Sequence, residues 1–176
     1  MANVLVVVAH PDDEVLMCGG TIVKHISNSD VVHVIVMCRT RTNRIGDAMR
    51  VLRCSFEQHV FADQKLDTHP LVDIIRPIEK EIAGYSPSIV YTHWMRDLNK
   101  DHRIVSEAVQ VACRPQPGHP VKTLLMGEVP SSTEWAGGFN PNWYVDVEEH
   151  WEKKIAALRC YDTEMRESPH PTRRKA

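Results

Sequence analysis

The sequence has no paired cysteines. Its five cysteines stand singly, none in a Cys-x-x-Cys pair, and they are Cys18, Cys38, Cys54, Cys113 and Cys160. An odd number of scattered cysteines argues against a disulfide framework and against a thiolate zinc site. We therefore expect free thiols, used mainly as small core residues, and a cytoplasmic protein in a reducing compartment.

A strong charge bias and a long hydrophobic run are also missing. The formal net charge is -2 at pH 7, with a pI near 6.5, so the composition offers no broad attraction to nucleic acid or anionic lipid. Acidic residues interrupt the first apolar run after a few positions, and no basic leader precedes it. We expect neither a secretory signal nor a membrane-spanning helix, and a small molecule is the expected partner.

Glycine-rich phosphate loops are absent as well. No Gly-x-Gly-x-x-Gly follows the first apolar run, and no Gly-x-x-x-x-Gly-Lys-Ser/Thr occurs anywhere. Nucleotide cofactors are therefore disfavoured. The pair Gly19-Gly20 falls within a predicted helix instead, where each glycine costs about 1 kcal/mol relative to alanine. Such a pair indicates a tight approach, either to the sheet or to a ligand.

What the sequence does contain is an alternation of strand-like and helix-like segments. The predicted strands are Val4–Ala9, Val31–Cys38, Ser88–Thr92 and Lys122–Met126, and the predicted helices are Glu14–Ile26, Ile45–Arg53, Leu71–Ala83 and Arg103–Ala112. This order predicts an α/β fold, a Rossmann-like three-layer sandwich with a mainly parallel sheet and helices on both faces. At 176 residues, the chain is expected to form one domain, 1–176.

The C-terminal part is predicted to add a short strand and a closing helix. Trp143–Val147 alternates like a strand, and the closing helix is expected from about Glu148 to Met165. Its apolar positions Trp151, Ile155, Leu158 and Tyr161 recur at helical spacing, so we expect them to pack on the sheet. The basic, proline-broken tail Pro169–Ala176 is expected to be exposed.

An imidazole and adjacent carboxylates directly follow the first predicted strand. His10, Asp12 and Asp13 come just after Val4–Ala9, a run that is predicted to be buried on both faces. Ligands bind at this edge of open α/β sheets. Adjacent carboxylates are costly unless a cation or a proton relieves them, and a divalent metal is the simplest relief.

A second cluster follows the predicted strand Ser88–Thr92. It consists of His93, Asp97, Asn99, Asp101 and His102. Two parallel strands that end at one edge can bring His102 beside His10 and Asp13, which gives a set of two histidines and one carboxylate. Such a set keeps a position open for water, as a catalytic metal requires, and Asp12 could then accept the proton of that water.

Each of these residues also has a purely structural interpretation. A single histidine at a strand end is more often part of a hydrogen-bonded framework than a ligand. Asp12 or Asp13 could cap the helix that follows, and Asp101 the next one. The joint occurrence of both clusters favours the metal site.

The sequence resembles the LmbE/PIG-L family of zinc-dependent deacetylases over almost its whole length. The motifs are Ala9-His10-Pro11-Asp12-Asp13-Glu14, Thr92-His93 and Asp97-Leu98-Asn99-Lys100-Asp101-His102-Arg103, with further likeness at Asp63, Arg114-Pro115, Ser131–Trp135 and Lys154–Pro171. The resemblance implies an N-deacetylase that acts on acylated amino sugars, such as N-acetylglucosamine derivatives, or on similar amides. It also implies zinc bound by His10, Asp13 and His102, with Asp12 as the base.

The resemblance also implies residues that bind the substrate. Arg44 matches a substrate-binding arginine of the family, although a solvated loop charge beside Arg39 and Arg41 is an equal alternative. Asp63 resembles a residue near the sugar, or it is a plain turn aspartate. His93 is expected near the substrate, where a water that it holds is one candidate for the general acid; Asp12 is the other.

Two departures from the family pattern bear on the mechanism and the domain. Many relatives have a histidine where this chain has Asn99, which can donate a hydrogen bond to an oxyanion but cannot deliver a proton. Relatives also continue beyond the position of Ala176, so either this member is shortened or the family's C-terminal segment lies outside this sequence. By analogy, the protein is expected to be a homo-oligomer.

Two alternatives to a zinc deacetylase stay open. One is a different mononuclear metal hydrolase or a ferrous-iron enzyme, because two histidines and one carboxylate also suit Fe²⁺ or another divalent metal. The other is a catalytically silent relative that binds a metal or ligand. The presence of Asp12 beside all three candidate ligands argues against the second, because a structural zinc site is typically closed and rich in thiolates.

Overall fold

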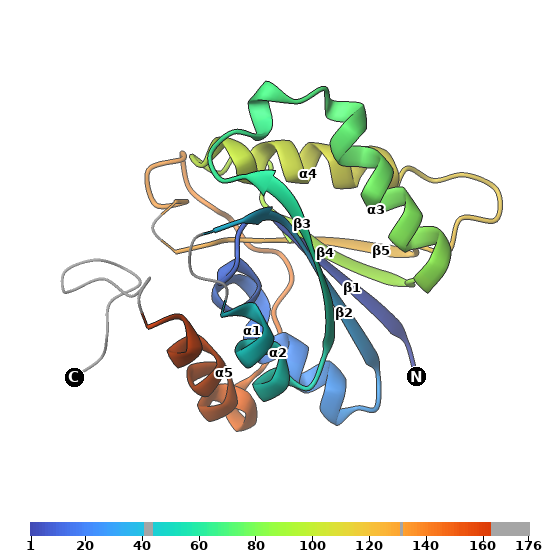
Figure 1. Cartoon of the computed structure of the whole chain (residues 1–176). Coiled ribbons are helices and arrows are strands. Elements are labelled where there is room, and N and C mark those ends of the chain that lie inside the picture. Colours follow the sequence, from blue (N-terminus) through green and yellow to red (C-terminus); the bar gives the residue numbers. More distant parts are fainter. Residues whose placement is uncertain (41–43, 131, 163–176) are drawn as a thin grey trace.

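A parallel sheet forms the middle of the molecule. The computed structural model describes residues 1–40, 44–130 and 132–162. Its strands are β1 (Asn3–Val8), β2 (Val31–Arg39), β3 (Ser55–Ala62), β4 (Ile89–His93) and β5 (Thr123–Gly127). All neighbours pair in parallel, in the order β3-β2-β1-β4-β5, as Figure 1 shows. The predicted α/β architecture is confirmed.

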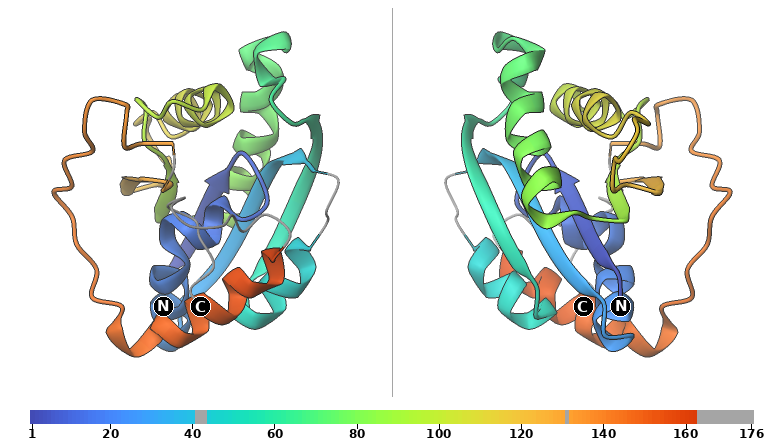
Figure 2. Two further views of the ribbon diagram at one scale, coloured as in Figure 1. Left: turned by 90° about the vertical axis from the view of Figure 1, so that its left-hand side faces the viewer. Right: turned by 90° about the vertical axis from the view of Figure 1, so that its right-hand side faces the viewer.

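Helices cover both faces of this sheet and complete three layers. The helices α1 (Asp13–Ser27), α2 (Ile45–Leu52) and α5 (Trp151–Leu158) lie on one face, and α3 (Leu71–Tyr85) and α4 (Lys100–Ala112) lie on the other (Figures 1 and 2). Alternation along β1 and the adjoining Ala9 explains the two cores, because Val4, Val6 and Val8 pack under the first group, whereas Leu5, Val7 and Ala9 pack under the second. Within the described part of the chain, every helix is too short or too polar to cross a membrane.

Some sequence-based expectations need correction. The strand β3 was not predicted, because it lies at the sheet edge and its residues are mostly exposed or half-buried, which hides the apolar pattern of a core strand. Trp143–Val147 does not form a strand, so that prediction is wrong. The short 3-10 helices Glu148–His150 and Arg159–Tyr161 flank α5, and the predicted helix end at Met165 and the tail Pro169–Ala176 lie outside the described residues.

The closing helix packs against other helices. Its contacts are chiefly with α1 and α2. Ala157 and Tyr161 are buried, but Trp151 keeps 42% of its surface exposed, so its predicted place on the sheet is wrong. The reason is that α1 and α2 already cover this face of the sheet.

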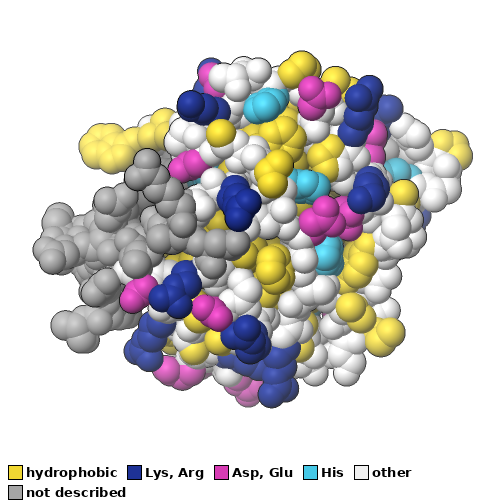
Figure 3. Space-filling model, viewed as in Figure 1, with side chains coloured by type: hydrophobic (Ala, Val, Ile, Leu, Met, Phe, Trp, Pro, Cys, Tyr) yellow, Lys and Arg dark blue, Asp and Glu magenta, His cyan; other side chains and the backbone are white. Residues whose placement is uncertain are grey.

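The surface carries charges of both signs. In the space-filling view of Figure 3, acidic and basic side chains are interspersed over the face seen in Figure 1. This distribution agrees with the small net charge of the sequence.

The pair Gly19-Gly20 marks a close approach between α1 and the C-terminal part of the chain. A Cβ atom added at Gly20 would lie 2.9 Å from Cβ of Val147, and one added at Gly19 would lie 3.3 Å from Cγ of Lys154. The approach predicted from the sequence therefore exists, but its partner is neither the sheet nor a ligand.

We expect Gly20→Ala to destabilise the fold by about 1–3 kcal/mol, because the new methyl group meets the Cβ branch point of Val147, which side-chain rotation cannot move. Gly84→Ala in α3 is the matched control, since an added Cβ there has no atom within 4 Å among the described residues. That change should stabilise by about 0.5–1 kcal/mol through helix propensity. Urea unfolding measures both, and a Gly20→Ala variant as stable as the wild type would contradict the close approach.

Candidate metal centre

The topology brings the two sequence motifs together. The order of strands along the sheet reverses between β1 and β4, which are direct neighbours, with Val7 opposite Thr92. In α/β sheets, ligands bind at the carboxyl ends of strands at such a reversal. The segment after β1 and the segment after β4 both emerge there.

Three side chains converge on one point at this edge. His10 Nδ1 lies 3.2 Å from His102 Nε2, and Asp13 Oδ2 lies 3.3 Å from the first atom and 3.2 Å from the second. Two ligand atoms about 2.1 Å from a zinc ion in tetrahedral geometry lie about 3.4 Å apart, so the three donors fit one metal ion. All three residues are buried, and no fourth ligand is needed from the protein if water takes that place.

Carboxylates support both histidines from behind. His10 Nε2 lies 3.2 Å from Asp101 Oδ2, and His102 Nδ1 lies 2.9 Å from Asp97 Oδ2. Metal-binding histidines typically donate their second ring N–H to such a group, which fixes the ring and its tautomer. The two nitrogens that face each other are thereby left as acceptors for a cation.

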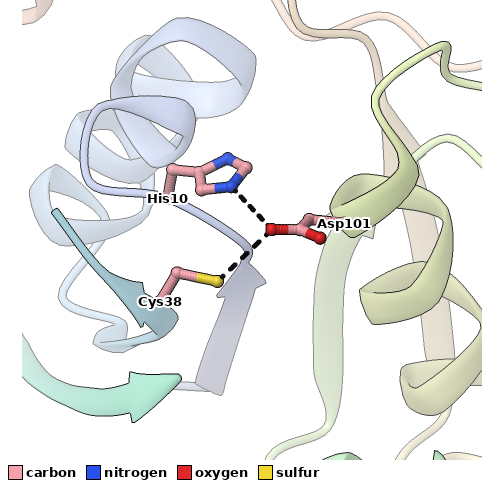
Figure 4. Close-up of side chains that lie close together, drawn as sticks. All are labelled: His10, Cys38 and Asp101. Carbon is pink, nitrogen blue, oxygen red and sulfur yellow. Dashed lines mark hydrogen bonds and ion pairs between the residues drawn. The ribbon is translucent and has the colours of Figure 1, made fainter. Parts of the chain in front are cut away.

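Asp101 is thus a partner of His10 and not the helix cap. Its carboxylate also accepts from the Leu66 backbone N–H at 3.2 Å and from the Cys38 thiol at 3.7 Å, as Figure 4 shows for His10, Cys38 and Asp101. Burial raises the pKa of Cys38, so the thiol stays neutral and can donate. The cap of α4 is Asn99, whose Oδ1 accepts from the Asp101 backbone N–H at 3.0 Å.

The group of His10, Cys38 and Asp101 could itself be considered for a metal, because its donor atoms lie within 4.8 Å of one another. It would use the Nε2 atom of His10, however. A neutral imidazole that binds a cation through Nδ1 carries its proton on Nε2, and this N–H donates a hydrogen bond to Asp101. We therefore interpret this group as hydrogen-bonded support of the first site.

The electrostatics of the cluster favour a positive charge. Burial lowers the pKa of His102, but Asp13 and Asp97 outweigh it and raise the pKa to about 9. Asp101 and Asp13 likewise raise the pKa of His10 despite its burial. Burial would raise the pKa of Asp13, yet the charge of His102 and the hydrogen bonds with His10 and His102 bring it well below its usual value. A cation placed among these groups takes over the stabilisation that protons would otherwise supply.

Asp12 adopts a rare backbone conformation beside the ligands. Its φ is 103° and its ψ is -30°, and its side chain does not cap α1. Such a conformation costs a residue with a side chain about 1–3 kcal/mol and is typical of functional sites. Asp12 is half-buried and stands in the chain between the buried Pro11 and the candidate ligand Asp13.

His93 lies beneath the ligand set. Its side chain is 0% exposed, its Nε2 accepts from the Ala9 backbone N–H at 2.8 Å, and its ring stacks on His102 with 3.9 Å between centroids. Burial lowers the pKa of His93 well below its usual value, so the ring is neutral. This placement supports His102 and leaves the predicted substrate contact of His93 without a free surface.

The remaining predicted substrate residues differ in where they lie. Asp63 follows β3, its carboxylate is 47% exposed, and it lies 3.2 Å from His10 Nε2, so it borders the site. Arg44 is exposed at the start of α2 and forms an ion pair of 3.4 Å with Asp47. The half-buried Asn99 uses its oxygen as the helix cap, which leaves its amide N–H groups as donors.

We expect Asp97→Asn to lower the affinity for zinc by about 10–100-fold, because the carboxylate holds both His102 and the Ser132 hydroxyl, the latter at 2.8 Å. Competition with a coloured chelator measures this affinity. Asp67→Asn is the control, since that exposed carboxylate pairs with Lys100 at the surface. Equal affinities in the two variants would contradict the supporting role of Asp97.

Sequence comparison gives two independent matches. The model of the family "PIG-L: GlcNAc-PI de-N-acetylase" matches residues 5–113, which include both motifs. The uncharacterized deacetylase YaiS of Escherichia coli (strain K12) is 31% identical over 173 residues, covering 89% of each chain.

Solved structures share the fold at low sequence identity. N,N'-diacetylchitobiose deacetylase from Pyrococcus horikoshii superposes with a TM-score of 0.75 at 17% identity, over 94% of this chain and 72% of that one. GalB, the 4-carboxy-2-hydroxymuconate hydratase of Pseudomonas putida KT2440, gives 0.75 at 20% identity, over 93% and 80%. Because a hydratase and a deacetylase share this architecture, the fold alone does not decide the reaction.

Proposed function

This chain belongs to the PIG-L (GlcNAc-PI de-N-acetylase) family of deacetylases, and from that premise we propose that it removes the N-acyl group, acetyl in the first instance, from an amino sugar or a similar small-molecule amide. The observation that carries this proposal is the convergence of His10, Asp13 and His102 within 3.2–3.3 Å, with Asp12 alongside. A purely structural zinc site would instead be closed and rich in thiolates.

We propose zinc as the cofactor, bound by His10, Asp13 and His102. Two imidazole nitrogens and one carboxylate oxygen suit Zn²⁺ and also Fe²⁺ or another divalent ion. When bound, such an ion polarises the acyl carbonyl and lowers the pKa of water to about 7. Metal analysis of protein purified without added metal identifies the ion.

The residues of the chain then have distinct tasks. Asp12 accepts the proton of the attacking water as the C–N bond is hydrolysed, and it returns that proton to the leaving amine. Asn99 donates an amide N–H to the developing oxyanion. Asp97 and Asp101 hold the two imidazoles in place. Asp63 and Arg44 are the candidates for binding the sugar.

Acetate release from N-acetylglucosamine and N,N'-diacetylchitobiose tests the proposal. We expect hydrolysis that stops after chelation and returns with zinc. Release of acetate without any dependence on a metal would contradict the assigned centre. Full metal occupancy without hydrolysis of these or other N-acyl amino sugars would favour a different metal hydrolase or a silent relative.

We further propose a cytoplasmic location and self-association. All five cysteines are free in the structure, which suits a reducing compartment. The homo-oligomer is proposed by analogy with the family, and light scattering of the purified protein tests it.

A further inference from the structure

Two buried side chains connect the C-terminal segment to the backbone of Asp12. The Tyr161 hydroxyl donates to Glu14 Oε1 at 2.7 Å, across 147 positions of sequence. The other oxygen of that carboxylate, Oε2, accepts from the Asp12 backbone N–H at 3.1 Å. Glu14 is 0% and Tyr161 is 1% exposed, so water does not compete for these hydrogen bonds.

A second contact fixes the same end of α1. The helix is kinked at Cys18, whose φ is -139° and ψ is 22°, and the Lys154 side chain packs against Gly19, the next residue, where an added Cβ would lie 3.3 Å from Lys154 Cγ. Its ammonium group donates to the Leu16 carbonyl at 3.2 Å. The segment from Lys154 to Tyr161 therefore holds the first turn of α1 at two points.

The hydrogen bonds of Glu14 with Tyr161 and Asp12 are not required for the formation of α1. The carboxylate of Glu14 is fully buried, which costs free energy because a polar group is taken out of water. An apolar residue would fill the position without that cost, unless the two hydrogen bonds serve a purpose. The group that benefits is the Asp12 peptide, whose φ of 103° persists only if surrounding contacts enforce it.

We propose that Glu14 and Tyr161 are positioning residues that hold Asp12 in its strained conformation and thereby aim its carboxylate at the metal centre. The inference rests on the proposed function of Asp12 as the base. The family match ends at residue 113, so Tyr161 lies in a part of the chain that this match does not cover. The C-terminal segment thus contributes to catalysis through Asp12 without touching the substrate.

Three variants test the positioning role of Glu14 and Tyr161. Tyr161→Phe keeps the ring and removes the donor, and we expect kcat to fall about 10-fold with KM and zinc content unchanged, as for the loss of one hydrogen bond to a charged group. Glu14→Ala removes both bonds, and the expected loss in kcat is about 100-fold. Glu14→Gln can still accept from Asp12 and donate to Tyr161, so it should stay within about 3-fold of the wild type.

Amide hydrogen exchange of Asp12 gives a readout that is independent of activity. We expect exchange about 10-fold faster in Tyr161→Phe, because Glu14 is then free to turn away from the Asp12 N–H. Tyr91→Phe is the matched control, since it removes a comparable tyrosine hydrogen bond, 3.0 Å to Nε2 of His25, which stands in the last turn of α1 at the opposite end from Glu14. It should change neither kcat nor the exchange of Asp12.

If Tyr161→Phe keeps the wild-type kcat and the wild-type amide exchange of Asp12, Tyr161 does not position Asp12. This holds even if the melting temperature falls, because the Tyr161–Glu14 hydrogen bond would then contribute only to the stability of the fold. A wild-type protein without amide hydrolysis would refute the proposed function instead. In that case the amide exchange of Asp12 in Tyr161→Phe and Tyr91→Phe still decides whether Tyr161 and Glu14 hold the Asp12 backbone.

Discussion

Asp12→Asn is expected to lower kcat by about 10²–10⁴-fold while the zinc content stays at that of the wild type, because general base catalysis contributes a factor of this size. Asparagine has nearly the same shape as aspartate and tolerates a positive φ better than most residues. The change therefore removes the proton acceptor and leaves the strained turn in place. Steady-state kinetics together with elemental analysis measure the two quantities.

Asp12→Ala provides the comparison. It also removes the acceptor, but alanine is less well suited to the φ of 103°. We expect the same loss of turnover, with retained metal and a lower stability than Asp12→Asn. Undiminished hydrolysis in either variant would remove Asp12 from the role of base.

His102→Ala is expected to weaken zinc binding by more than about 100-fold and to abolish turnover with it. Loss of a residue that only orients a ligand typically costs up to about 100-fold, so loss of a ligand should cost more. The change removes one of three convergent donors and leaves Asp13 and Asp97 buried without their common partner. Calorimetric titration of the metal-free protein and metal analysis after dialysis measure the loss.

His119→Ala is the matched control for this variant. His119 bonds to the Ala112 carbonyl at 3.1 Å, at the opposite end of α4 from His102. It should bind zinc as the wild type does. Full metal occupancy in His102→Ala would contradict the assignment of the ligands and, with it, the proposed centre.

The sequence predicted most of the fold because buried parallel strands are continuous apolar runs. The strands β1 and β2 have this pattern, and their predicted bounds differ from the observed ones by one residue at most. The pattern failed at the edge strand β3, which is held by pairing with β2 although its side chains are largely accessible to solvent. It also failed at Trp143–Val147, where alternation occurs without a neighbouring strand.

The sequence by itself predicted His10, Asp13 and His102 as candidate donors, since they follow the ends of two strands and parallel pairing carries both ends to one edge, where the three side chains meet. The tertiary structure decided the partners of that set. Asp101 could be interpreted as a cap until its carboxylate was found beside His10, and Tyr161 gave no signal for a contact with Glu14. Local spacing fixes where a side chain leaves the backbone, whereas the group that it meets depends on how distant segments pack.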